Sequence, residues 1–202
     1  RFLYIRFISL SMKRRTVLKS LFFGGTAIIG GIGSWNAYQI FKTPDLASLQ
    51  NQIPLLNALA QTIIPRTDSP GAGDANAGVY IAKMIQKCYD KKTQNRFVNG
   101  LAAIQQKANS RFDLNYENCS EEQRIELLSE AESSGKSLPG SAGKLQKKVL
   151  GDSFFGTLKE LTCEAYCTSM EGMNQGLAYD YVPGKFLGCI TLNPGQKSWA
   201  TK

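Results

Sequence analysis

The stretch that decides the fold is Leu46-Ala47-Ser48-Leu49-Gln50-Asn51-Gln52-Ile53-Pro54-Leu55-Leu56-Asn57-Ala58-Leu59-Ala60-Gln61-Thr62-Ile63-Ile64-Pro65. Its apolar residues recur at steps of three and four, which predicts amphipathic helix, with Asp45 as a cap. Pro65 ends the run. Pro54 lies inside it, so we expect either one helix or two, the second beginning near Pro54 as a first-turn residue. The predicted buried face consists of Leu46, Leu49, Ile53, Leu56, Ala60 and Ile63.

Working outward from this stretch, further helical patterns fill most of the chain. Ser120 to Gln123 has the pattern of a capping box ahead of Ile125, Leu127 and Leu128. Residues 65–78 are rich in Pro, Gly and Asp and predict an extended loop, while residues 133–148 predict a Gly-, Ser- and Lys-rich connection. The other predicted helices cover residues 79–88, about 91–111 and about 152–170, the last burying Phe154, Phe155, Leu158, Leu161, Ala165 and Tyr166.

The part of the chain after residue 170 is rich in proline, glycine and aromatic residues. We expect an irregular C-terminal segment with room for short strands. The fold class is therefore mainly α: a single helical domain over residues 43–202 with a long irregular C-terminal segment. Aromatic side chains beside proline and glycine are typical of interface anchors, and a packed loop is the alternative. The candidate partner-contact residues are Pro65 in the loop and Tyr179, Tyr181, Pro183 and Phe186 in the C-terminal segment.

The positive charge of the chain is concentrated at its N-terminal end. The formal net charge is +8, but residues 1–19 contain six basic residues and no acidic one, which leaves +2 for the rest. A body so nearly balanced lacks the electrostatic footprint of a phosphate-binding surface. We therefore expect no nucleic-acid partner.

Residues 1–42 have the pattern of a twin-arginine export leader. Lys13-Arg14-Arg15-Thr16-Val17-Leu18-Lys19 is followed by the uncharged, glycine-rich residues 20–41, and Arg14, Arg15, Leu18 and Lys19 carry the signal. The uncharged stretch is either cleaved or retained as a membrane anchor, because 22 residues just span a bilayer. Met12 precedes the motif, so residues 1–11 are interpreted as an over-extended start. The leader predicts a periplasmic, membrane-associated protein that engages the twin-arginine translocase.

Several common kinds of catalytic or cofactor site are excluded by composition. The chain has no histidine, which removes Ser-His and Cys-His pairs and His-ligated zinc or haem. It also lacks a Walker loop, a complete dinucleotide fingerprint and a Cys-x-x-Cys-His haem motif. We therefore expect no catalytic, metal or cofactor site in this chain.

The five cysteines are an odd number for an exported protein, so at least one thiol stays unpaired. Cys163 and Cys167 share one helix face, and we expect them to be buried small residues rather than metal ligands. Cys88 ends a predicted helix and Cys189 lies in the C-terminal segment. A disulfide between these two would tie that segment to the helices, and we state it as a hypothesis.

Five blocks of the sequence form an ordered set. They are Leu59 to Ala72, Cys88-Tyr89-Asp90, Phe154-Phe155 through Leu161-Thr162, Tyr166-Cys167-Thr168-Ser169, and Tyr179 to Cys189. In this order they resemble the gluconate 2-dehydrogenase subunit 3 family over roughly residues 52–192. In one place the chain departs from that family, which commonly has Gly and Phe where this chain has Ala165 and Cys167.

This resemblance implies a non-catalytic small subunit of a membrane-associated sugar, sugar-acid or alcohol dehydrogenase. The implied partners are a large flavoprotein subunit similar to the glucose–methanol–choline oxidoreductases, which holds the FAD, and a multihaem cytochrome c subunit. The resemblance also implies that this chain supplies the export signal for a flavoprotein that lacks one. The residues leave two alternatives open: a stand-alone exported enzyme, and a periplasmic binding or structural protein unrelated to redox chemistry.

Overall fold

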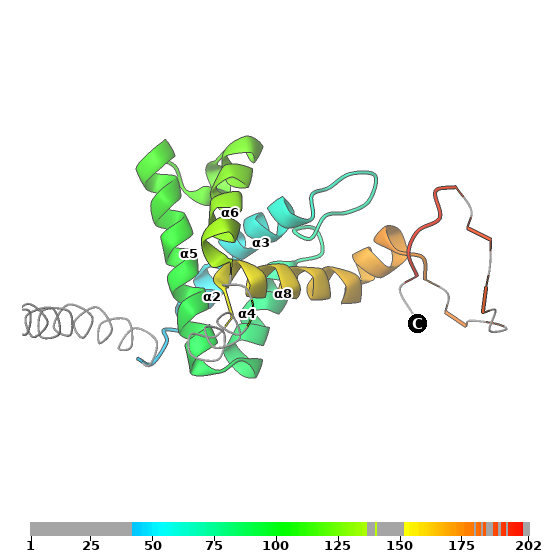
Figure 1. Cartoon of the computed structure of the whole chain (residues 1–202), viewed down its shortest axis with the longest axis horizontal. Helices are drawn as coiled ribbons and strands as arrows, with labels where there is room; N and C mark the ends of the chain where they lie inside the picture. Colours follow the sequence, from blue (N-terminus) through cyan, green and yellow to red (C-terminus); the bar gives the residue numbers. More distant parts are fainter. Residues whose placement is uncertain are drawn as a thin grey trace, which may run out of the picture. The chain divides into compact units, whose positions relative to one another are not determined.

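The computed structural model describes residues 42–136, 140, 152–179, 181–182, 184, 188–189, 191–192 and 194–199, all within a unit that spans residues 42–202. This part of the chain is mainly helical, as predicted (Figure 1). None of its helices is both long and apolar enough to cross a membrane. In chain order the elements are α2 (Ser48–Asn51), α3 (Ile53–Ile63), α4 (Ala77–Cys88), α5 (Lys91–Phe112), the 3-10 turn η1 (Tyr116–Asn118), α6 (Glu121–Gly135), α8 (Phe154–Thr168) and the π-helical turn η2 (Gly172–Gly176).

The sequence signals at Pro54, Asp45 and Ser120 are found at helix starts. The stretch that opens the domain forms two helices, and Pro54 lies in the first turn of the second, where proline loses no intrahelical hydrogen bond. The Asp45 carboxylate accepts a hydrogen bond from the Ser48 amide at 3.3 Å. The capping box at α6 is present: Ser120 Oγ accepts from the Gln123 amide, and the Gln123 side chain accepts from the Ser120 amide at 2.9 Å.

Helices α6 and α8 have boundaries that differ from the prediction. Helix α6 continues to Gly135, so it includes the start of the stretch predicted as a connection, whose residues 137–139 and 141–148 lie outside the described part of the chain. Helix α8 is two residues shorter at each end than predicted. It starts after Ser153, whose hydroxyl accepts from the Gly156 amide at 3.1 Å, and it stops at Ser169, which has an extended backbone.

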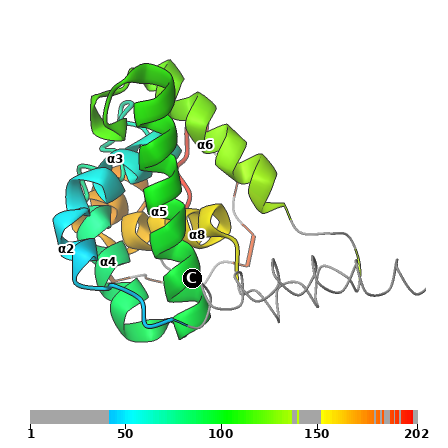
Figure 2. The ribbon, with the colours of Figure 1, turned by 90° about the vertical axis from the view of Figure 1, so that its left-hand side faces the viewer.

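Helix α8 is the central element of the helical body. It packs against α3, α4, α5 and α6, and it runs across α5 and α6 rather than alongside them (Figures 1 and 2). At its start the Phe154 ring lies on the Phe97 ring of α5, with ring centroids 5.3 Å apart. Leu158, Leu161, Thr162, Ala165 and Tyr166 form its buried face.

The core is formed by apolar side chains from every major helix. Leu56 and Leu59 of α3 are fully buried, as are Ile81 and Ile85 of α4 and Leu101 of α5. The sequence pattern predicted full burial for some residues near helix ends that are only partly buried, because a side chain there has packing neighbours on one side only. Leu49, Leu56 and Ala60 are buried as predicted, whereas Leu46, Ile53, Ile63, Phe154 and Phe155 are partly buried.

Tyr116 fixes the turn between α5 and α6 to the core. Its side chain is fully buried, and its hydroxyl lies 3.1 Å from Thr62 Oγ1 and 3.4 Å from the Arg124 carbonyl oxygen. Its amide donates to Gln105 Oε1 at 3.3 Å. Burial raises the pKa of Tyr116 to about 12, so the phenol stays protonated and can donate its hydrogen bond throughout the physiological range.

Truncating the buried face of α8 tests its central position. Leu161→Ala should lower the free energy of unfolding by about 2–5 kcal/mol, because the removed atoms leave a cavity among well-packed neighbours. Leu114→Ala is the matched control, since Leu114 is 41% exposed and its loss should cost less than about 1 kcal/mol. Denaturant unfolding of the purified chain measures both values. Equal losses would contradict the central position of α8.

Candidate partner interface

The loop that joins α3 to α4 is held in shape by hydrogen bonds. It covers residues 64–76 and ends two residues earlier than predicted, because α4 already begins at Ala77. Gln61 Oε1 of α3 accepts from the Gly73 amide at 2.8 Å. The Asp74 carboxylate accepts from the Gly71 amide at 2.8 Å and forms an ion pair with Arg66. These contacts order the loop before any partner binds it.

The ion pair lies at the surface of the loop. The Arg66 side chain is 68% exposed and that of Asp74 is 26% exposed. The Arg66 guanidinium and the Gly71 amide hold the pKa of the Asp74 carboxyl below its ordinary value, because both hydrogen bonds favour the charged form. An ion pair this exposed contributes little to global stability, so its effect is on the loop itself.

Pro65 lines a surface hollow of about 250 Å³ between α3 and α6. Ile125 also lines it and is 51% exposed, although the sequence pattern placed Ile125 with Leu127 and Leu128, which are buried. The full lining is Gln61, Thr62, Pro65, Arg66, Glu121, Arg124 and Ile125.

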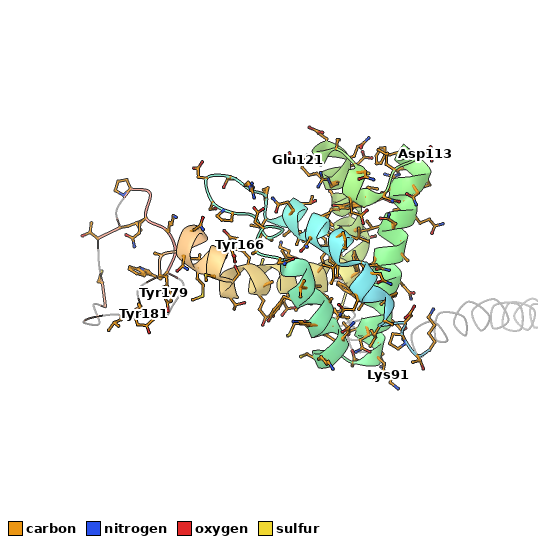
Figure 3. The ribbon with its side chains drawn as sticks, turned by 180° about the vertical axis from the view of Figure 1, so that it is seen from behind. Lys91, Asp113, Glu121, Tyr166, Tyr179 and Tyr181 are labelled. Carbon is orange, nitrogen blue, oxygen red and sulfur yellow. The ribbon has the colours of Figure 1, made fainter. Side chains whose placement is uncertain are left out.

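The predicted aromatic residues of the C-terminal segment lie at the surface. Tyr179 is 41% exposed and Tyr181 is 85% exposed, and both lie beyond the end of α8, away from α5, whose start and end are marked by Lys91 and Asp113 (Figure 3). Pro183 and Phe186 lie outside the described residues. In place of the short strands that the sequence allowed, the described residues show an isolated pairing of Ala178 with Trp199.

Exposed apolar side chains are concentrated in this segment. The sequence reasoning missed Leu192 and Trp199, although a large apolar residue in a stretch rich in Gly and Pro is the signal that could have found them. The exposed large apolar residues of the described chain are Leu114, Ile125, Met170, Tyr179, Tyr181, Val182, Leu192 and Trp199. Five of these eight lie between residues 179 and 199, which makes this segment the strongest candidate for a contact surface.

The two cysteines of α8 are exposed, so the prediction that they are buried was wrong. The buried face of α8 is made by Leu158, Leu161 and Ala165 on the opposite side of the helix, which turns Cys163 and Cys167 toward solvent. All five cysteines are free thiols in the structure. The Cys88–Cys189 disulfide is therefore not shown, and it stays a prediction.

The remaining predictions concern the export signal and metal binding. The export-signal residues Arg14, Arg15, Leu18 and Lys19 lie in the part of the chain that the structure does not describe. Within the described ranges, no three His, Cys, Asp or Glu side chains are grouped so that they could hold a metal ion.

Comparison with known proteins gives one match. A family model described as gluconate 2-dehydrogenase subunit 3 matches residues 50–184, which include α3, the loop, the helical body and the first part of the C-terminal segment. Curated proteins and solved structures give no significant match. The matched range contains both Pro65 and the Tyr179–Tyr181 region.

Removing the Asp74 charge should loosen the loop. Asp74→Asn should speed tryptic cleavage after Arg66 by about two- to five-fold at neutral pH, the range expected for a surface ion pair. Asp68→Asn, in the same loop and exposed, is the matched control and should cleave at the wild-type rate.

The same contact predicts a pH dependence for the wild-type loop. The pKa of Asp74 is lowered on folding, so the contact stabilises the loop above the ordinary pKa of 3.8 and is lost as the pH falls through the lowered pKa. Hydrogen exchange of the loop peptides, corrected for intrinsic rates, should therefore accelerate only below that range. Acceleration beginning near neutral pH would contradict this assignment.

Proposed function

The chain belongs to the gluconate 2-dehydrogenase subunit 3 family, and from this membership we propose that it is the non-catalytic small subunit of a periplasmic, membrane-associated dehydrogenase. The family name describes a subunit of an oxidoreductase complex, so partner subunits are implied. In this proposal the chain exports and stabilises an FAD-dependent flavoprotein that oxidises a sugar, a sugar acid or an alcohol. The observation that carries the proposal is this membership, joined to the concentration of exposed apolar residues in the C-terminal segment.

Two features of the chain support an accessory role over a catalytic one. The sequence has no histidine, the commonest general acid and base, and no recognisable cofactor motif. Two of the perturbed pKa values among the described residues also have structural causes: Tyr116 is a buried core residue and Asp74 belongs to a loop ion pair. The chemistry of the complex is therefore assigned to partner subunits, with FAD in the large flavoprotein and haem c in a cytochrome subunit.

The twin-arginine pattern supplies the reason for pairing this chain with a flavoprotein. FAD is inserted in the cytoplasm, and the twin-arginine route carries folded cargo, so a leaderless flavoprotein could cross the membrane while bound to a chain that has the signal. In this proposal Arg14 and Arg15 direct the pair to the translocase, and the uncharged residues after them are either cleaved or kept as an anchor.

Purification of the full chain tests the proposed complex. A C-terminal affinity tag on this chain, used on detergent-solubilised membranes of its native host, should recover a second chain of flavoprotein size with yellow flavin absorbance. Haem absorbance in the same fraction would identify the cytochrome subunit. A lone, colourless chain would instead favour a stand-alone exported enzyme or a periplasmic binding protein.

Conservative replacement of the twin arginines tests the export role. Arg14→Lys with Arg15→Lys keeps the charge but removes the paired guanidinium groups that define the signal. Both this chain and the dehydrogenase activity of its partner should then stay in the cytoplasm, as measured by cell fractionation. Lys13→Arg is the control and should export normally. Periplasmic activity in the double variant at the wild-type level would count against export of the partner by this chain.

A further inference from the structure

A second groove, separate from the hollow beside Pro65, runs along α5. It lies between the junction of α2 with α3 and one face of α5, η1 borders it, and its volume is about 450 Å³. A hollow of this size is large enough for a side chain or a small organic molecule. The lining is Asn51, Gln52, Leu55, Leu101, Ala102, Gln105, Gln106, Asn109 and Glu117.

The groove has an apolar floor and polar walls. Leu55 and Leu101 are buried and form the apolar part. Gln105 is fixed in the wall, because its Oε1 accepts from the Tyr116 amide at 3.3 Å. Carboxamide groups make up most of the polar lining, and they belong to Asn51, Gln52, Gln105, Gln106 and Asn109.

The charge of the groove is negative. Glu117 is the one charged residue of the described lining, and none of the ion pairs among the described residues involves it. The nearest basic residues along α5 are engaged with α6. Lys107 forms an ion pair with Glu130. Arg111 forms ion pairs with Glu126 and Glu130. Figure 2 shows α6 on one side of α5 and α3 on the other, so these cations serve the opposite face.

Two acceptor oxygens of the lining have no donor. Gln52 Oε1 and Glu117 Oε2 are buried, and no described residue donates a hydrogen bond to either. Such oxygens normally have a partner, since burying them without one costs free energy. Both side chains are only partly buried, and the terminal torsion of Glu and Gln rotates over a broad range. A rotation about that bond turns each oxygen toward a donor placed in the groove.

From the negative charge, the two unpartnered acceptors and the apolar floor, and resting on the function proposed above, we propose that this groove receives a Lys or Arg side chain of the large flavoprotein subunit. Its cationic head pairs with the Glu117 carboxylate and donates to Gln52. Its methylene stem packs on Leu55 and Leu101. Lys and Arg are the side chains that combine an apolar stem with a permanent positive charge, which is the combination that the groove complements.

The open shape of the groove favours a side chain delivered by a protein over a free small cation. Asn51, Ala102, Gln106 and Asn109 of the lining are exposed, so the groove is open to solvent. Small ligands bind in sites that enclose most of their surface. A protein partner supplies the missing cover, and the exposed carboxamides offer donors and acceptors to its polar groups.

The preference for a cation is tested on the chain alone. n-Butylguanidinium reproduces the end of an arginine side chain, and it should shift the NMR signals of the Gln52 and Gln105 side-chain amides in the detergent-solubilised full chain. n-Butylurea is its uncharged analogue and should leave these signals in place. Glu117→Gln should abolish the shifts caused by the guanidinium. Equal shifts with the two probes, or none with either, would overturn the proposal.

Recovery of the flavoprotein subunit by tagged full-length variants tests the partner. Glu117→Gln should reduce recovery roughly ten-fold or more, because the cation of the partner is then buried without its counter-charge. Glu160→Gln is the matched control. It removes the same charge from an exposed position on α8, and recovery should stay at the wild-type level.

An added arginine gives an independent pair of variants. Asn109→Arg brings the chain's own guanidinium into the groove that Glu117 lines, so it should reduce recovery to a similar degree without lowering the temperature of thermal unfolding. Ser110→Arg adds the same charge at the next residue, which is exposed and outside the lining, and should recover the flavoprotein normally. If Glu117→Gln fails to fold, Asn109→Arg and the two probes still decide the proposal.

The outcomes separate this proposal from the proposed function. If the wild-type chain recovers no flavoprotein, the proposed function fails, while the probes still decide which ligand class the groove selects. If the wild-type chain recovers it and both Glu117→Gln and Asn109→Arg recover as much, the groove proposal is overturned. Probe binding with unchanged recovery would assign the groove to a free organic cation. A dimer of the chain alone that is lost in Glu117→Gln, measured by sedimentation, would assign it to a second copy. Either result would also overturn the proposal.

Discussion

The burial of one face of α8 is the constraint on which the rest of the structure depends. This helix meets α3, α4, α5 and α6, so its face of Leu158, Leu161 and Ala165 is where most of the body comes together. Burying several large aliphatic side chains at such a junction stabilises the fold more than the surface ion pairs do, since each buried side chain is worth about 1.5–3 kcal/mol and each exposed pair about 0–1 kcal/mol. The hydrogen-bonded Tyr116 adds a second fixed point between α5 and α6.

The same constraint explains what α8 leaves at the surface. A helix that buries one face must turn the opposite face outward, and Cys163 and Cys167 lie there. Helix α8 ends at Thr168, where Ser169 has an extended backbone and donates a hydrogen bond to the Tyr166 carbonyl oxygen. Gly172 of η2 approaches the same carbonyl oxygen closely. In Figure 1 the turn η2 and the loop over residues 64–76 lie toward the same end of the helical body. The surface with the most exposed apolar side chains is thus set by the geometry of one helix end.

In the proposed function each part of the chain has its own role. The helical body holds the contact elements in place, the hydrogen-bonded loop and the C-terminal segment contact the partner, and the N-terminal leader directs the assembled pair to export. The physical logic is that of an adaptor: ordered contact elements lose little conformational entropy on binding, and the redox groups belong to partners that have the residues to hold them. Exposed apolar side chains are costly for a protein that works alone, and they are ordinary for one that works within a complex.

The sequence by itself determined the helical class, the capping box at Ser120, the loop after Pro65 and the family, and it left open whether the stretch around Pro54 forms one helix or two. These follow from local signals: apolar periodicity, the missing proline amide and capping side chains act within a few residues of each other. Only the tertiary structure decided which apolar residues are covered. Ile125 follows the same local pattern as Leu127 and Leu128, and Cys163 shares its helix with Leu161, yet Ile125 and Cys163 are exposed because no described neighbouring helix covers them. The packing of η2 against Tyr166 could not be predicted from local patterns for a related reason. Glycine predicts a turn, but the close approach of Gly172 to the Tyr166 carbonyl oxygen exists only in the folded chain.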